Sequence, residues 1–229
     1  MSDLPVKEMP LKETPLKIWD GWVRLVHWSI VILIPVSYLS ARAHRMDIHI
    51  LSGFTVLTLV IFRILWGLIG SDTARFVNFL RSPFAALAHL RHLRRDPGPD
   101  REMGHNPAGG WMVMVLLGVL LTQAVTGLFT DDQIFTRGPL AREVSGAWSD
   151  FAGSIHIRMI YFIGAAVLAH IIAIIWYRVS LGHDLVQAMM IGTKPMPEGT
   201  TPPRMGHPIL ALGLLAASAG FVNWISRFG

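Results

Sequence analysis

The chain has 229 residues, of which 52% are hydrophobic and only 15% are charged, with a formal net charge of +5. This composition is typical of a membrane protein, and we assign the positive charge to membrane topology, with no nucleic acid as a partner. The chain has no cysteine, which excludes disulfides, iron–sulfur clusters and covalently attached c-type haem.

Apolar segments long enough to cross a bilayer recur along the chain. A hydrocarbon core of ~30 Å needs about 20 mostly apolar residues in a helix. Residues 1–21 are polar and no cleavage site follows the first apolar segment, so we expect an uncleaved anchor. We also expect Pro35 to kink the first span. The predicted spans are residues 22–41, 49–70, 110–129, 154–177 and a shorter one, 208–225.

These spans predict an all-α membrane protein, a four-helix transmembrane bundle with a fifth, C-terminal transmembrane helix. We divide it into four parts. They are a cytoplasmic N-terminal tail (1–15), the four-helix bundle (16–182), a Pro-rich linker (183–206) and the fifth helix (207–229).

Lys and Arg residues are concentrated in two polar segments. The loop 71–109 has six arginines, whereas the connection between the third and fourth spans has two arginines against four acidic residues. Two arginines after the first span are a mild exception. Because cytoplasmic loops carry the excess of Lys and Arg, we predict that the N-terminus and the loop 71–109 are cytoplasmic. The cations before and at the start of the first span are Lys7, Lys12, Lys17 and Arg24.

Four histidines lie in or at the ends of the predicted spans: His27, His49, His156 and His170. The last two are fourteen residues apart, so they lie roughly 21 Å apart along one helix and on nearly the same face. Alternating span directions pair His27 with His170 at cytoplasmic depth, and His49 with His156 at periplasmic depth. Ionisable residues inside a membrane are expensive and indicate function. We predict that each pair, drawn from two helices, binds one haem b.

A haem with histidine on both sides has no open position, which suits electron transfer. Nearby residues support this hypothesis. Gly53, one turn after His49, and Gly164 leave room for a porphyrin. Arg63, on the same face as His49, is expected to pair with a haem propionate. The metal ligands are thus the four histidines, Gly53 and Arg63 are cofactor-binding candidates, and no catalytic residue is predicted.

Each of these residues also has a purely structural interpretation. A single histidine near a span end is more often an interfacial or core residue, Arg63 can snorkel to the surface, and membrane glycines commonly ease helix packing. The remaining histidines fall in loops and receive this structural interpretation; they are His44, His89, His92, His105, His183 and His207.

Four segments carry a family resemblance: KIWDGWVRLVHWSI, HILSGF, GHNPAGGWMV and HIRMIYFIGAAVLAH. Over residues 16–182 the chain resembles the prokaryotic cytochrome b561 and nickel-iron hydrogenase b-type cytochrome family, related to the b subunits of formate dehydrogenases. The resemblance implies a four-helix dihaem cytochrome of the bacterial inner membrane with quinone as a substrate. Related enzymes have a quinone site near one haem, often the cytoplasmic one, and residues 104–107 either border such a site or form only a turn and helix start. The fifth span departs from the pattern.

The resulting hypothesis is an electron carrier between the quinone pool and a redox partner at the periplasmic face, such as a hydrogenase, a dehydrogenase or a c-type cytochrome. Whether the chain is itself an enzyme stays open, as does a homodimer. One alternative is a stand-alone cytochrome that oxidises superoxide and reduces quinone. A remote alternative is a haem-free, histidine-lined metal or proton transporter, against which the absence of Asp and Glu inside spans one to four counts.

Overall fold

The computed structural model describes residues 12–95, 98–133 and 136–228, so Lys7 and residues 1–11 of the predicted tail lie outside the described residues. Within these ranges, five helices are long and apolar enough to cross a membrane. The predicted fold class, an all-α membrane protein, is therefore confirmed. The five helices are α1 (Gly21–Arg42), α2 (Met46–Ile69), α5 (Pro107–Gly127), α6 (Gly146–Leu181) and α8 (Pro208–Ile225).

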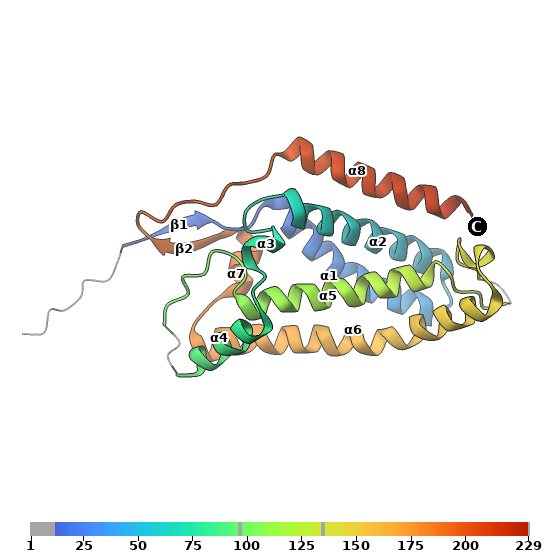
Figure 1. The fold of residues 1–229 in the computed structure, drawn as a ribbon, viewed down its shortest axis with the longest axis horizontal. Helices are drawn as coiled ribbons and strands as arrows, with labels where there is room; N and C mark the ends of the chain where they lie inside the picture. The colour runs from blue at the N-terminus through green and yellow to red at the C-terminus, as the bar shows by residue number, and fades with distance from the viewer. Residues whose placement is uncertain (1–11, 96–97, 134–135, 229) are drawn as a thin grey trace, which may run out of the picture.

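The first four long helices form two hairpins that lie side by side (Figure 1). Helix α1 packs closely on α2 and α5 packs closely on α6, while α2 and α5 join the two hairpins. The fifth helix, α8, lies against the outer side of α2 (Figure 1). The backbone of α6 thus packs closely on α5 and not on α1 or α2. Contact between α6 and the α1–α2 hairpin therefore depends on side chains.

Local sequence explains where the long helices begin. The Asp20 and Asn106 side chains cap α1 and α5 by accepting hydrogen bonds from Val23 N and Gly109 N, both at 2.8 Å. Helix α6 begins eight residues before the predicted span, at Gly146, because Ser145 caps it and its first turns are polar enough to extend beyond the apolar segment. Helix α1 continues through Pro35 as one helix.

Short elements gather at one end of the bundle, which we call the basic end. Strands β1 (Glu13–Lys17) and β2 (Thr193–Pro197) form a two-stranded antiparallel sheet there. The other elements of this end are the helices α3 (Phe76–Phe79), α4 (Pro83–Arg95) and α7 (Leu185–Ile191). The connection between α5 and α6, with the 3-10 helix Ala141–Glu143, lies at the opposite end, as does the C-terminal end of α8 (Figure 1).

A buried cluster near the basic end ties α1, α2 and α8 together. Trp66 and Phe62 of α2 stack with ring centroids 6.0 Å apart and are fully buried against Val26 and Ala211. The Trp66 indole N–H donates to the buried Asp20 carboxylate at 3.0 Å. One acidic side chain therefore both caps α1 and satisfies the only polar atom of a buried tryptophan.

Candidate functional site

The structure brings the four predicted histidines together in two pairs. Each pair joins one ring from the α1–α2 hairpin with one ring from α6. His27 of α1 and His170 of α6 have ring centroids 6.4 Å apart, and we call them the first pair. His49 of α2 and His156 of α6, the second pair, are 6.0 Å apart. A metal bound by both rings at about 2.0–2.1 Å from each nitrogen requires centroids about 6 Å apart. Both separations therefore fit one metal ion between two imidazoles.

In the second pair, one nitrogen of each ring is held by the protein backbone. His49 Nδ1 lies 2.9 Å from Ser37 O, and His156 Nδ1 lies 2.8 Å from Gln123 O. A carbonyl oxygen only accepts, so Nδ1 carries the proton in both rings. This tautomer leaves the Nε2 lone pair of each ring for a metal, the arrangement that orients histidine ligands.

Gly127 gives the His156 ring its place beside α5. A Cβ atom at Gly127 would lie 2.8 Å from His156 Cε1 and 3.1 Å from Nδ1, which is closer than side chains tolerate. Gln123, one turn earlier on α5, has its amide nitrogen 3.2 Å from both ring nitrogens of His156. Sequence reasoning missed both residues, although a glutamine in the middle of a span is itself a signal, because polar groups are costly there.

In the first pair, the turn of α1 that carries His27 is anchored to α7 by its neighbouring residues. Arg24 donates to the carbonyls of Met189, at 3.2 Å, and Met190, and the Trp28 indole N–H approaches Met189 O at 3.4 Å. His27, between them in sequence, turns toward His170 instead. The Nδ1 atom of His27 is buried without a hydrogen-bond partner among the described residues. An unsatisfied imidazole nitrogen also occurs at His89 and His105, so it does not by itself mark His27 as a ligand.

Arg63 lies in α2 toward the basic end and is only 5% exposed. Its Nη1 donates to Ala74 O at 3.2 Å, and its guanidinium carbon is 5.3 Å from the Phe76 ring centroid. Among the described residues it forms no ion pair within 4.0 Å. Arg63 therefore points inward and does not snorkel. The Asp20 carboxylate attracts it from beyond ion-pair distance, and a buried cation with no closer carboxylate among the described residues favours an added anion.

The two glycines that were expected to leave room for a porphyrin have open space beside them. A Cβ atom at Gly53 or Gly164 would meet nothing within 4 Å. Neither glycine is therefore needed for close helix packing in this structure.

His105, which the sequence analysis treated as a structural loop residue, lies beside the first pair. Its ring packs between Trp19 and Phe79, with centroid distances of 4.7 Å to each. Burial, together with the positive charge of Arg63, lowers the pKa of His105 to about 3, so this imidazole is neutral at physiological pH. The next residue, Asn106, donates to the Tyr177 hydroxyl at 2.8 Å, so residues 104–107 form a packed turn and helix start.

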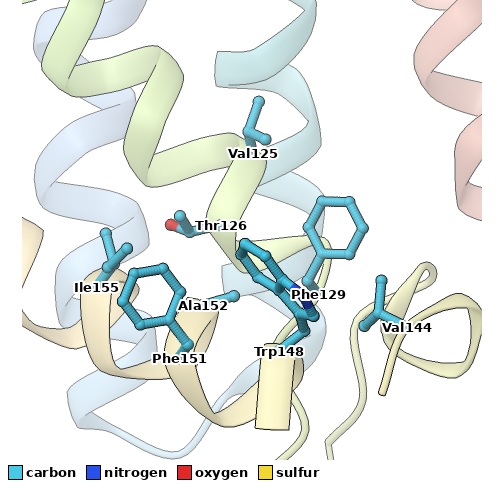
Figure 2. A pocket seen from close by; sticks show the side chains of 8 residues that line it. All are labelled: Val125, Thr126, Phe129, Val144, Trp148, Phe151, Ala152 and Ile155. Carbon is cyan, nitrogen blue, oxygen red and sulfur yellow. The ribbon is translucent and has the colours of Figure 1, made fainter. Parts of the chain in front are cut away.

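Close to the second pair is an apolar pocket of about 340 Å³ between α5 and α6. Figure 2 shows the rings of Phe129, Trp148 and Phe151 around it, with Thr126 as its one hydroxyl. That hydroxyl already donates to Thr122 O at 2.7 Å. The lining therefore suits a hydrocarbon chain better than a polar head group.

The comparisons with known proteins give one family. The family model described as prokaryotic cytochrome b561 matches residues 18–192, which includes all four histidines, Arg63 and His105. No curated protein matches the chain. The matched region covers most of the chain and contains the two hairpins and both histidine pairs, and the chain belongs to the prokaryotic cytochrome b561 family.

Proposed function

We propose that this membrane b-type cytochrome binds two haems b and carries electrons across the membrane between a redox partner and the quinone pool. The observation that carries the proposal is the geometry of the two pairs, in which imidazoles from different helices face each other at centroid distances of 6.4 and 6.0 Å. Two protein ligands per site is the number that a six-coordinate haem iron takes, whereas a structural zinc takes four.

The chain's own residues would hold each haem in a fixed orientation. In the second pair, the carbonyls of Ser37 and Gln123 hold the ring tautomers in which Nε2 carries the lone pair. The Gln123 amide, now near both nitrogens of His156, would turn away from Nε2. In the first pair, Arg63 would neutralise a propionate. Haem iron supplies one-electron redox chemistry, and ligation from both sides leaves no position for oxygen.

The charge distribution supports an inner-membrane orientation with the basic end in the cytoplasm. Both residues 12–20 and the described part of the arginine-rich connection between α2 and α5 lie at this end (Figure 1). The first pair would then lie toward the cytoplasm and the second toward the periplasm, where the redox partner would dock. The quinone would exchange electrons with the haem of the first pair, beside which His105 lies.

Single substitutions of the two α6 histidines test the proposal. We expect His156→Ala to remove only the haem of the second pair and His170→Ala only that of the first, so each variant retains one haem per chain. The measurement is haem content per protein from the reduced pyridine spectrum, with a redox titration to identify which haem remains. His44→Gln, in the turn between α1 and α2, is the matched control and should retain both.

Two results would reject the proposal. A purified, folded wild-type protein without a reduced b-type spectrum would reject haem binding. A folded His156→Ala protein that has lost both haems, or has kept both, would reject the pairing.

The lack of cysteine allows a direct test of orientation. Single cysteines replacing Arg101, near the basic end, and Gly146, at the opposite end, are labelled in intact cells with a membrane-impermeant maleimide. We expect labelling at position 146 only; labelling at position 101 only would invert the topology. Oxidation of the reduced protein by a water-soluble ubiquinone analogue, followed by stopped-flow absorbance, tests the quinone.

A further inference from the structure

A second cavity, of about 530 Å³, lies at the basic end between α4 and α6. Helix α4 contributes Leu87, Leu90, Arg91 and Arg94, which follow the i, i+3, i+4, i+7 spacing of a single helix face. Helix α6 contributes Ile172 and Trp176, one turn apart. The cavity thus has an apolar floor from both helices and two arginines at one side.

The cavity does not belong to the space between the hairpins that the histidines line. At about 100° per residue, Ile172 and Trp176 are rotated by roughly 200° and 240° from His170 on α6. They therefore lie on the side of α6 that faces away from the first pair, and Ile172 is 56% exposed. On this outer side the neighbour of a transmembrane helix is lipid.

Within the part of the chain that the structure describes, the two arginines of the cavity have no carboxylate as an ion-pair partner. Arg91 and Arg94 are exposed and form no ion pair within 4.0 Å among the described residues. Both guanidinium groups are therefore free to bind an external anion, and the guanidinium fork matches the oxygen atoms of a phosphate. The cavity has both arginines and an apolar lining, whereas a water-soluble anion would need only the arginines.

Helix α4 has the properties of a helix that lies at a membrane surface. Its arginines and histidines alternate with apolar residues, and Phe84 is 83% exposed although it is large and apolar. Exposed apolar side chains next to unpaired arginines are stable where hydrocarbon meets the head-group layer. Trp176, with its indole ring, is the residue type expected at that depth.

We propose that this cavity binds one anionic phospholipid, with the phosphodiester held by Arg91 and Arg94 and an acyl chain along Leu87, Leu90 and Ile172. Basic pockets beside transmembrane helices at the inner face are suited to such head groups. The lipid would fix α4 against α6 and so connect the arginine-rich segment to the helix that carries His156 and His170. The inference does not depend on haem or quinone binding.

The test measures lipid binding to the full-length protein purified in a neutral detergent. Native mass spectrometry follows a titration with a short-chain phosphatidylglycerol, and the matching phosphatidylcholine is the neutral reference. We expect one tightly bound phosphatidylglycerol on the wild type. The variant R91Q/R94Q should bind it about ten- to thirtyfold more weakly. The variant R81Q/R95Q removes the same charge from the same segment outside the cavity and should bind like the wild type.

Each remaining outcome is decisive. Equal weakening in both double variants would overturn the proposal in favour of diffuse surface charge, and equal affinity for phosphatidylcholine would overturn the role of the arginines. If millimolar inorganic phosphate displaces the lipid and Leu90→Asn has no effect, the site is one for a free anion and the proposal fails. If R91Q/R94Q does not accumulate, R91K/R94K replaces it, because lysine keeps the charge without the guanidinium fork. Unchanged phosphatidylglycerol binding in both R91K/R94K and Leu90→Asn would again refute the site.

Discussion

Gly127→Ala should disturb the second histidine pair specifically. The new Cβ would lie 2.8 Å from His156 Cε1, whereas ordinary contact begins at 3.4 Å, so the ring must retreat by about 0.6 Å (3.4 − 2.8). The His156 ring is not free to do so, because Nδ1 is bound to Gln123 O at 2.8 Å. Overpacking of this kind costs about 1–3 kcal/mol, and a weakened hydrogen bond adds about 0.5–1.5 kcal/mol.

We therefore expect the Gly127→Ala protein to retain the haem of the second pair about ten- to two-thousandfold more weakly, while the first pair is unaffected. The assay is haem content after dialysis against apomyoglobin, combined with a redox titration that resolves the two haems. Gly118→Ala is the matched control, since it lies on the same helix and its Cβ would meet nothing within 4 Å. A Gly127→Ala protein with two haems and unchanged titration, or an equal loss in Gly118→Ala, would show that the close approach to His156 has no functional meaning.

Three further substitutions test the surroundings of the site. Arg63→Gln should shift the potential of the first pair's haem or release it and leave the other haem unchanged in a redox titration, because it removes a buried cation. Asp20→Ala should lower the melting temperature by several degrees, since it removes a helix cap worth about 0.5–2 kcal/mol and leaves the Trp66 indole N–H unpaired; an unchanged melting temperature would contradict this. The hydrogen bond from the Arg204 N–H lowers the pKa of Asp72. The stability that ionised Asp72 contributes is therefore present at neutral pH and is lost as the pH falls through that lowered pKa. Asp72→Asn should therefore make the linker before α8 protease-sensitive at pH 7, and equal cleavage of wild type and variant at pH 7 would contradict the role of Asp72.

The long helices could be predicted from the sequence because their signal depends on composition alone. Twenty apolar residues have few alternatives to a membrane span, and the predicted ranges agree with α1, α2, α5 and α8 within a few residues. The 14-residue spacing of His156 and His170 fixes their shared face for the same reason, since a continuous helix has one geometry. Helix α6 begins earlier than predicted because its first turns are capped and polar.

The remaining features depend on contacts between distant segments. Strands β1 and β2 contain prolines at positions 15, 195 and 197, which argue against strands, and they form only because each provides the other's edge. His105 appears in sequence as one more loop histidine, and only the fold brings Trp19 and Phe79 against its ring. The supporting roles of Gln123 and Gly127 likewise require knowledge of where His156 lies on the neighbouring helix.

The small β-sheet can form only late in biosynthesis, because its two strands are far apart in the sequence. Residues 13–17 leave the ribosome before the four spans of the bundle, whereas their pairing partners, residues 193–197, follow only after those spans have been made. Strand β1 therefore stays unpaired while α1, α2, α5 and α6 insert. It pairs with β2 only after the second hairpin has been synthesised. Helix α8 is synthesised after this closure and packs on α2 from outside. Truncation after residue 192 would thus leave β1 without its partner strand, whereas truncation after residue 206 would keep the sheet and remove α8 from the buried cluster of Trp66 and Phe62.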